Sequence, residues 1–168
     1  MGVVPPLEAS KRATNPMAKP LPFIHIKAAK FPVLTGEEKE LVNPGTYGKA
    51  LAQYLEARLK EKAYEAPFIC CEDWGWWVEI KGLPFATGVR VYATSDLPEN
   101  HELCVTVTPA PGPRWSWRRF RPIDTTPHIT RLFADLTAVF KSDPDVEVLG
   151  FPEDCPLSEP PPPEEAPE

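Results

Sequence analysis

The chain has 168 residues, the length of one domain, and an ordinary globular composition of 42% hydrophobic and 25% charged residues. Its 23 prolines make up about 14% of the residues, against a usual share of ~5%, and this excess predicts long irregular segments. Its 9 glycines show no period, which excludes a collagen-like chain. The net charge of −6 equals that of the six acidic side chains in residues 153–168; the rest of the chain is neutral and has no global basic field for nucleic acid or an anionic membrane.

The two ends of the chain differ in composition from its middle. Residues 1–20 contain scattered prolines without an apolar period and are predicted to form a disordered arm. Residues 153–168 are acidic and proline-rich and are predicted to form a disordered tail. Residues 21–152 are predicted to form one domain. Its first element is a short strand at Phe23–Lys27, expected at a sheet edge because the preceding Pro22 cannot donate a ladder hydrogen bond.

Two segments have the apolar spacing of amphipathic helices. The first begins at Asn43-Pro44, a good N-cap followed by a proline at the first helical position, and ends near Lys62. The second begins at Thr125-Thr126-Pro127 and ends before Asp143. The apolar stripes are Tyr47, Leu51, Tyr54, Leu55 and Leu59 in the first helix and Ile129, Leu132, Phe133, Leu136, Val139 and Phe140 in the second.

Between and after these helices, short runs with a two-residue alternation predict strands. The runs are 68–71, 76–81, 87–93, 102–108 and 146–151. Short connections favour an antiparallel meander, and each strand has one apolar face. The predicted fold class is therefore α+β, with an antiparallel β-meander sheet and two amphipathic helices packed on one face as a two-layer sandwich.

The four cysteines do not form a metal-binding or disulfide pattern. Cys70 and Cys71 are adjacent and would point to opposite faces of a strand, and no Cys-x-x-Cys or zinc-type histidine spacing occurs. Free thiols in a reducing, cytoplasmic compartment are expected, with no metal and no cofactor. No signal peptide and no apolar run of ~20 residues is found, so no membrane partner is expected.

The first candidate site is the Trp-rich turn, residues 72–77. Carboxylates of Glu72 and Asp73 beside Trp74 and Trp77 could act as acids with a raised pKa, and the indoles could stack on a sugar or a base. The alternative is structural, with Trp76 in the core and the two acids bonded to turn N–H groups. Because adjacent carboxylates on a strand diverge, the turn indicates an interaction surface more than a catalytic site.

The second candidate site is the arginine–aromatic segment, residues 114–121, in the long connection before the second helix. Arginines alternating with aromatic residues suit phosphate contacts and base stacking, or an acidic protein surface. The alternative is an edge strand whose aromatics pack inward and whose arginines pair with surface acids such as Glu79. The arginines and tryptophans of this site are Arg114, Trp115, Trp117, Arg118, Arg119 and Arg121.

The acidic tail contains Pro-x-x-Pro and can present a polyproline helix, but it lacks the flanking basic residue that an SH3 groove favours. A solubilising tail is the preferred interpretation. Support for nucleophilic catalysis is weak, because the chain has no Gly-x-Ser-x-Gly or phosphate-loop motif, and a Cys–His dyad would depend on tertiary contact.

The Glu-Asp-Trp-Gly-Trp turn after the first helix and the Trp117–Phe120 segment before the last one resemble those of a group of small uncharacterised bacterial proteins, some of them immunity-like. The resemblance spans about residues 40–150 and implies a compact binding module without a transferred active site. The leading hypothesis is a non-catalytic protein-interaction module with a protein partner. The alternatives are a small enzyme using Glu72 or Asp73, and a single-stranded nucleic-acid binder using residues 114–121. The oligomeric state is not predicted.

Overall fold

The computed structural model describes residues 19–157, so most of the predicted arm and tail lies outside the described residues. The main sheet has six strands in the order β2-β3-β4-β5-β1-β8, all antiparallel. Its strands are β1 (Ile24–Lys27), β2 (Ile69–Glu72), β3 (Gly75–Ile80), β4 (Thr87–Tyr92), β5 (Glu102–Thr108) and β8 (Glu147–Gly150). The helices are α1 (Lys49–Glu61), the short α2 (Leu97–Asn100) and α3 (Thr126–Ser142), with a 3-10 turn, η1, at Glu37–Lys39.

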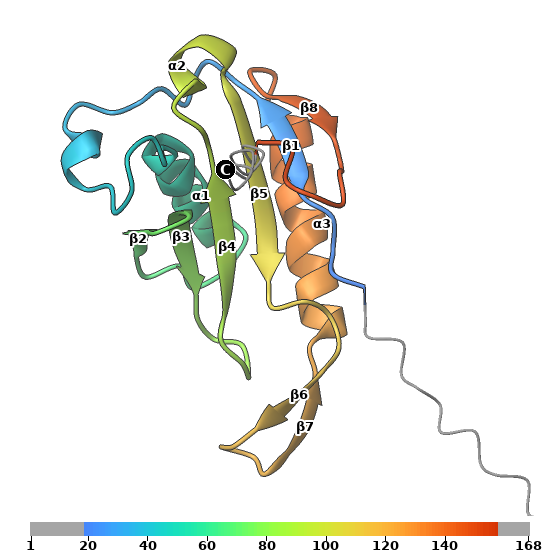
Figure 1. Ribbon diagram of the computed structural model, residues 1–168. Coiled ribbons are helices and arrows are strands. Elements are labelled where there is room, and N and C mark those ends of the chain that lie inside the picture. Colours follow the sequence, from blue (N-terminus) through green and yellow to red (C-terminus); the bar gives the residue numbers. More distant parts are fainter. Residues whose placement is uncertain (1–18, 158–168) are drawn as a thin grey trace, which may run out of the picture.

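The predicted fold class is confirmed: this is an α+β protein with both long helices on one face of an antiparallel sheet (Figure 1). α1 packs against β2 and β3, and α3 packs against β5 and β8. Strands β2 to β5 form the expected meander, and β5 has the predicted bounds. We call the sheet face that carries the helices the inner face and the opposite one the outer face.

The inner face forms a continuous apolar layer. Cross-strand pairing places Trp76, Val91, Val105 and Ile24 in one row across four strands, and all four are buried. The residues of the two predicted stripes are buried except for three, which are half-buried and pack against the same cluster: Tyr47, Tyr54 and Phe133. Burial of this layer is the main stabilising term of the fold, because each fully buried aliphatic side chain contributes about 1.5–3 kcal/mol.

The prediction that residues 23–27 form an edge strand is wrong. β1 lies inside the sheet, paired with β5 on one side and β8 on the other. Pro22 precedes the strand and removes no ladder hydrogen bond, while the N–H of Phe23 donates to the C=O of Pro152 at 2.9 Å. The sequence argument failed because it placed the proline inside the ladder.

The predicted start of the first helix at Asn43-Pro44 is also wrong, since α1 begins at Lys49 after Gly48. The helix is capped by a residue from η1: Oε1 of the buried Glu37 accepts hydrogen bonds from the N–H groups of Gly48 (2.9 Å) and Lys49 (3.0 Å). The other oxygen of Glu37 accepts from the N–H of Leu34 at 2.9 Å. A carboxylate at a helix N-terminus satisfies orphan donors and complements the helix dipole.

The Asp143 carboxylate at the end of α3 joins three parts of the chain. Its Oδ2 accepts from Lys30 Nζ at 2.6 Å and from the Tyr54 hydroxyl at 2.7 Å, and its Oδ1 accepts from the N–H of Asp145. The hydrogen bonds from Lys30 and Tyr54 lower the pKa of Asp143 to about 2. Burial, followed by the hydrogen bond to this carboxylate, raises the pKa of Tyr54 to about 12.

We predict that Leu136→Ala lowers the free energy of unfolding by about 2–5 kcal/mol, because it removes buried methyl groups and leaves a cavity under the sheet. Denaturant titration measures this change. Leu149→Ala, at an exposed position on β8, serves as the control and should cost much less. A cost below about 1 kcal/mol for Leu136→Ala would contradict the two-layer packing.

We predict that Asp143→Asn flattens the acid limb of the stability curve. The pKa of Asp143 is about 2 in the folded state against an ordinary 3.8. The carboxylate therefore stabilises the fold above pH 3.8, and this contribution disappears as pH falls from 3.8 towards 2. Chemical denaturation at several pH values measures the slope, with the exposed Asp96→Asn as control. An unchanged slope in Asp143→Asn would overturn the assignment.

Candidate functional site

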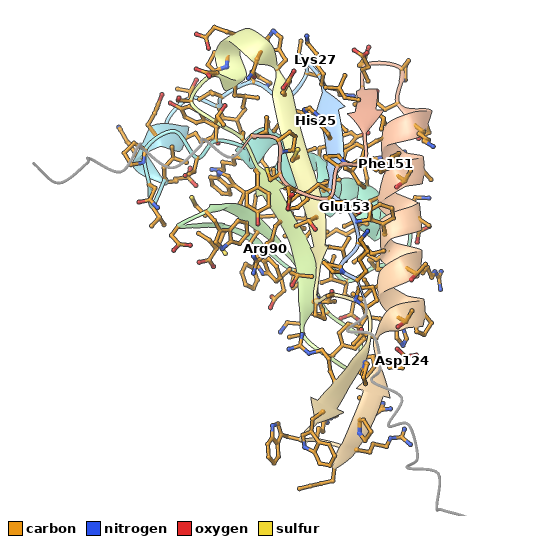
Figure 2. All side chains as sticks on the ribbon, turned by 45° about the vertical axis from the view of Figure 1, so that its right-hand side comes forward. His25, Lys27, Arg90, Asp124, Phe151 and Glu153 are labelled. Carbon is orange, nitrogen blue, oxygen red and sulfur yellow. The ribbon has the colours of Figure 1, made fainter. Side chains whose placement is uncertain are left out.

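The arginine–aromatic segment forms a separate two-stranded hairpin, β6 (Pro113–Ser116) and β7 (Arg121–Asp124). We call residues 113–124 the hairpin. Figure 1 shows it extending beyond the end of the main sheet, and Asp124 in Figure 2 marks the junction with α3. The hairpin is thus not an edge strand of the main sheet.

Thr125 fixes the base of this hairpin. Its buried hydroxyl accepts from the N–H of Gly112 at 3.0 Å, and its own N–H donates to the C=O of Gly112 at 2.9 Å. Thr125 is also the residue before α3, as the sequence predicted, although its side chain bonds to Gly112 and not to the first turn of the helix. Instead, Asp124 Oδ1 accepts from the N–H of Thr126 at 3.0 Å. The hairpin and the helix therefore share one anchor.

The aromatic side chains of the hairpin face solvent. Relative exposure is 53% for Trp115, 78% for Trp117 and 76% for Phe120. Trp115 and Trp117 contact each other edge-on with centroids 6.0 Å apart. These three side chains therefore do not pack inward, contrary to what the structural alternative expected. Exposed apolar side chains that lie together are typical of contact surfaces.

The arginines of the hairpin have no carboxylate partner in the part of the chain that the structure describes. Among residues 19–157, no carboxylate forms an ion pair with Arg114, Arg118, Arg119 or Arg121. The expected acceptor Glu79 pairs instead with Lys81, at 3.2 Å between Oε1 and Nζ. Four like charges therefore lie close together without an acidic partner in the described chain.

The Trp-rich turn divides its residues between the two faces of the sheet. Trp76 is buried in the core, whereas Trp77 lies in the outer-face row with Arg90. Trp74 packs beside both, with ring centroids 6.4 Å from Trp77 and the Arg90 guanidinium 4.9 Å above its ring. The Arg90 side chain, visible in Figure 2, thus lies over an indole on the outer face.

The two acidic residues of the turn, Glu72 and Asp73, have different hydrogen-bonded contacts. Glu72 accepts a hydrogen bond from the Cys70 thiol at 3.5 Å, and the backbone C=O of Asp73 accepts from Asn43 Nδ2 at 2.6 Å. Burial, then Glu72, raises the pKa of Cys70 to about 11, which makes this thiol a poor nucleophile. Both acids are exposed, and neither lines the groove described next.

A groove of about 760 Å³ lies between the hairpin and the β3–β4 connection. It brings together Trp77 from the first candidate site and Arg118 and Arg119 from the second, so two motifs about 40 residues apart in sequence meet in one place. The groove is also lined by Glu79, Lys81, Leu83 and Phe85. A volume of this size lies within the range of ligand-binding clefts.

Trp77 is held in the groove by Gly88 on the neighbouring strand. A Cβ at position 88 would come within 2.4 Å of Trp77 Cζ2 and 2.5 Å of the Val78 C=O. Only glycine therefore lets the indole lie against β4 at this point. The ring both packs on the sheet and lines the groove.

Sequence reasoning named Glu79 only as an acceptor for the arginines, and it missed Arg90, Lys81 and Phe85. Arg90 and Glu79 were on the predicted polar faces of their strands, and that alternation was the only available signal. Arg90 Nε and Glu79 Oε2 are buried without a hydrogen-bond partner in the described structure. Lys81 and Phe85 come from the connection between β3 and β4, whose direction the sequence does not determine.

No family model, curated protein or solved structure matches this chain. No helix in residues 19–157 has the length and apolar character needed to cross a membrane. Among the same residues, no three His, Cys, Asp or Glu side chains are grouped as metal ligands would be. All four cysteines are thiols, with Cys104 buried and the others half-buried. The site itself is therefore the basis for proposing a function.

We predict that Gly88→Ala destabilises the protein by about 1–3 kcal/mol, because the new methyl group overlaps Trp77 and the Val78 C=O. Denaturant titration measures the cost. Gly150→Ala is the matched control, because a Cβ at that strand position meets no atom within 4 Å. In the double variant Trp77→Ala/Gly88→Ala the losses should be less than additive, which a double-mutant cycle detects. Strict additivity would contradict the contact.

Proposed function

We propose that this protein is a non-catalytic interaction module that binds a protein partner with an acidic surface through the hairpin. The observation that carries the proposal is the combination, on one projecting hairpin, of three exposed aromatic side chains and four arginines that form no ion pair within residues 19–157. Arginine and tryptophan are the residue types most enriched at interaction hot spots. The anchor at Thr125 presents them from a fixed base.

The chemistry of the hairpin suits carboxylates on the partner. Arginine binds a carboxylate through two parallel N–H donors, and such charge-assisted hydrogen bonds are stronger than neutral ones. The indoles next to the arginines would exclude water from these pairs and add apolar contact area. A partner surface with acidic side chains around an apolar patch would complement both parts.

The thiols suit a reducing, cytoplasmic compartment. An immunity-like or defence accessory role would use the same surface, since such proteins act by binding another protein. In this role Glu72 and Asp73 have no catalytic task.

A single-stranded nucleic acid is the second candidate partner. Trp77 against Gly88 and the Arg90–Trp74 contact are arrangements on which bases and phosphates could stack and bind. The protein partner is preferred because the sequence apart from residues 153–168 is neutral, and this net charge gives no global attraction for a nucleic acid.

We predict that Arg118→Ala/Arg119→Ala weakens binding of a labelled glutamate-rich peptide to the full chain by at least about tenfold, or about 1.4 kcal/mol, at low salt. The difference from wild type should shrink as salt rises, because exposed charges are screened. Trp117→Ala should weaken binding with little salt dependence, because loss of apolar contact is not screened. Fluorescence anisotropy at two salt concentrations measures both effects.

Arg131→Ala is the matched control, because this arginine is exposed on α3 outside the hairpin. The free energy of unfolding should change by no more than about 1 kcal/mol in the arginine variants. Binding of a thymidine oligonucleotide in place of the peptide would favour the nucleic-acid candidate. Unfolding of the arginine variants, or unchanged binding of both probes, would reject the hairpin as the binding site.

A further inference from the structure

The groove has a mixed character that restricts its occupant. Trp77, Leu83 and Phe85 form an apolar and aromatic side, while Arg118 and Arg119 add two cations at the hairpin. The single carboxylate, Glu79, is paired with Lys81. A complementary ligand therefore has an apolar stretch that packs on aromatic rings and an adjacent pair of acids.

The described chain ends on the same face of the sheet as this groove. After β8, Pro152 accepts a hydrogen bond from the N–H of Phe23, and Lys19 contacts Glu153. Figure 2 shows Phe151 and Glu153 on this segment. Further along, the Cys155 thiol is hydrogen-bonded to Cys104 on β5.

The strand register gives the separation between Cys155 and the groove. Cys104 is paired with Tyr92, and Arg90, two residues before Tyr92, is paired with Trp77. The path from Cys104 to Trp77 thus crosses two strand spacings and two residues, which is roughly 12 Å in a regular sheet. Cys155, which contacts Cys104, therefore lies on the outer face, the face that also carries Trp77.

The sequence that follows Cys155 has the required chemistry. Residues 159–165 read Glu-Pro-Pro-Pro-Pro-Glu-Glu. Residues 156 and 157 lie in a turn. A polyproline II chain rises about 3.1 Å per residue, so the four prolines 160–163 can span about 12 Å, the same length as the separation of Cys104 and Trp77 in the sheet. Glu164 and Glu165 follow directly after the prolines.

We propose that residues 159–165 of this chain occupy the groove, with the prolines on Trp77 and Phe85 and the glutamates on Arg118 and Arg119. Aromatic-lined grooves bind polyproline segments because the extended chain is preformed and loses little entropy on docking. The covalent link gives the segment a high effective concentration at the groove. This occupant is independent of the protein partner proposed above, and it would compete with that partner for Arg118 and Arg119.

The test is the NMR signal of the Trp77 indole N–H in the full chain. Pro161→Ala/Pro162→Ala and Glu164→Gln/Glu165→Gln should each move the Trp77 signal, which Trp77→Phe assigns, and leave that of the buried Trp76 in place. Glu38→Gln/Glu99→Gln is the control with the same change of charge at exposed positions. A synthetic peptide of residues 158–168 should shift Trp77 more in the glutamine variant than in wild type.

Each other outcome rejects this occupant. An unmoved Trp77 signal in both tail variants means that the tail does not occupy the groove. A Trp77 shift that fades on dilution assigns the groove to the tail of a second copy. A Trp77 shift caused by a thymidine oligonucleotide, with no effect of the tail variants, assigns it to nucleic acid.

Competition with the partner is measured separately. The tail variants should bind the glutamate-rich peptide several-fold more tightly than wild type if the tail covers Arg118 and Arg119. Equal affinity, together with a moved Trp77 signal, would restrict the tail to the aromatic side of the groove and overturn the contact with the arginines. Because the peptide affinity of Arg118→Ala/Arg119→Ala is a different measurement, failure of the hairpin proposal and failure of the tail proposal are distinguishable.

Discussion

Burial of the inner face of the sheet under α1 and α3 is the constraint from which the rest of the structure follows. The row of Trp76, Val91, Val105 and Ile24 runs across four strands, and a one-residue slip in any of these strands would turn its apolar set towards solvent. Because both helices cover the same face, the outer face keeps the alternate residues, including Trp77 and Arg90. The core thus determines which side of the protein carries aromatic and cationic side chains.

Much of this architecture could be predicted from the sequence, because it depends on periodicity. Alternation in residues 102–108 and the apolar stripe of α3 are local signals, and both elements lie where the sequence placed them. The start of α1 does not depend on a local sequence signal. Glu37 caps it from outside the helix, and no pattern around Asn43 contains that information. The prediction of an edge position for β1 was wrong for the same reason, because its second neighbour, β8, is the last strand in the chain.

The candidate site was predictable as two pieces but not as one. Composition indicated the turn around Trp77 and the segment around Arg118 as two candidate sites, because tryptophan and clustered arginine are unusual in any domain. Their meeting in one groove depends on the direction of the hairpin and on the space that Gly88 leaves for the indole. A glycine in a strand suggests a close approach of some kind, but it does not say which side chain approaches.

The shared anchor at Thr125 has a mechanical consequence. The hairpin has no strand partner in the main sheet, and its base is bonded where α3 begins. A load applied at the hairpin tip is therefore transmitted to the first turn of α3, where backbone N–H groups depend on Asp124 and on the capping geometry for protection from solvent. We therefore expect amide hydrogen exchange in that turn to change when a partner binds at Trp117.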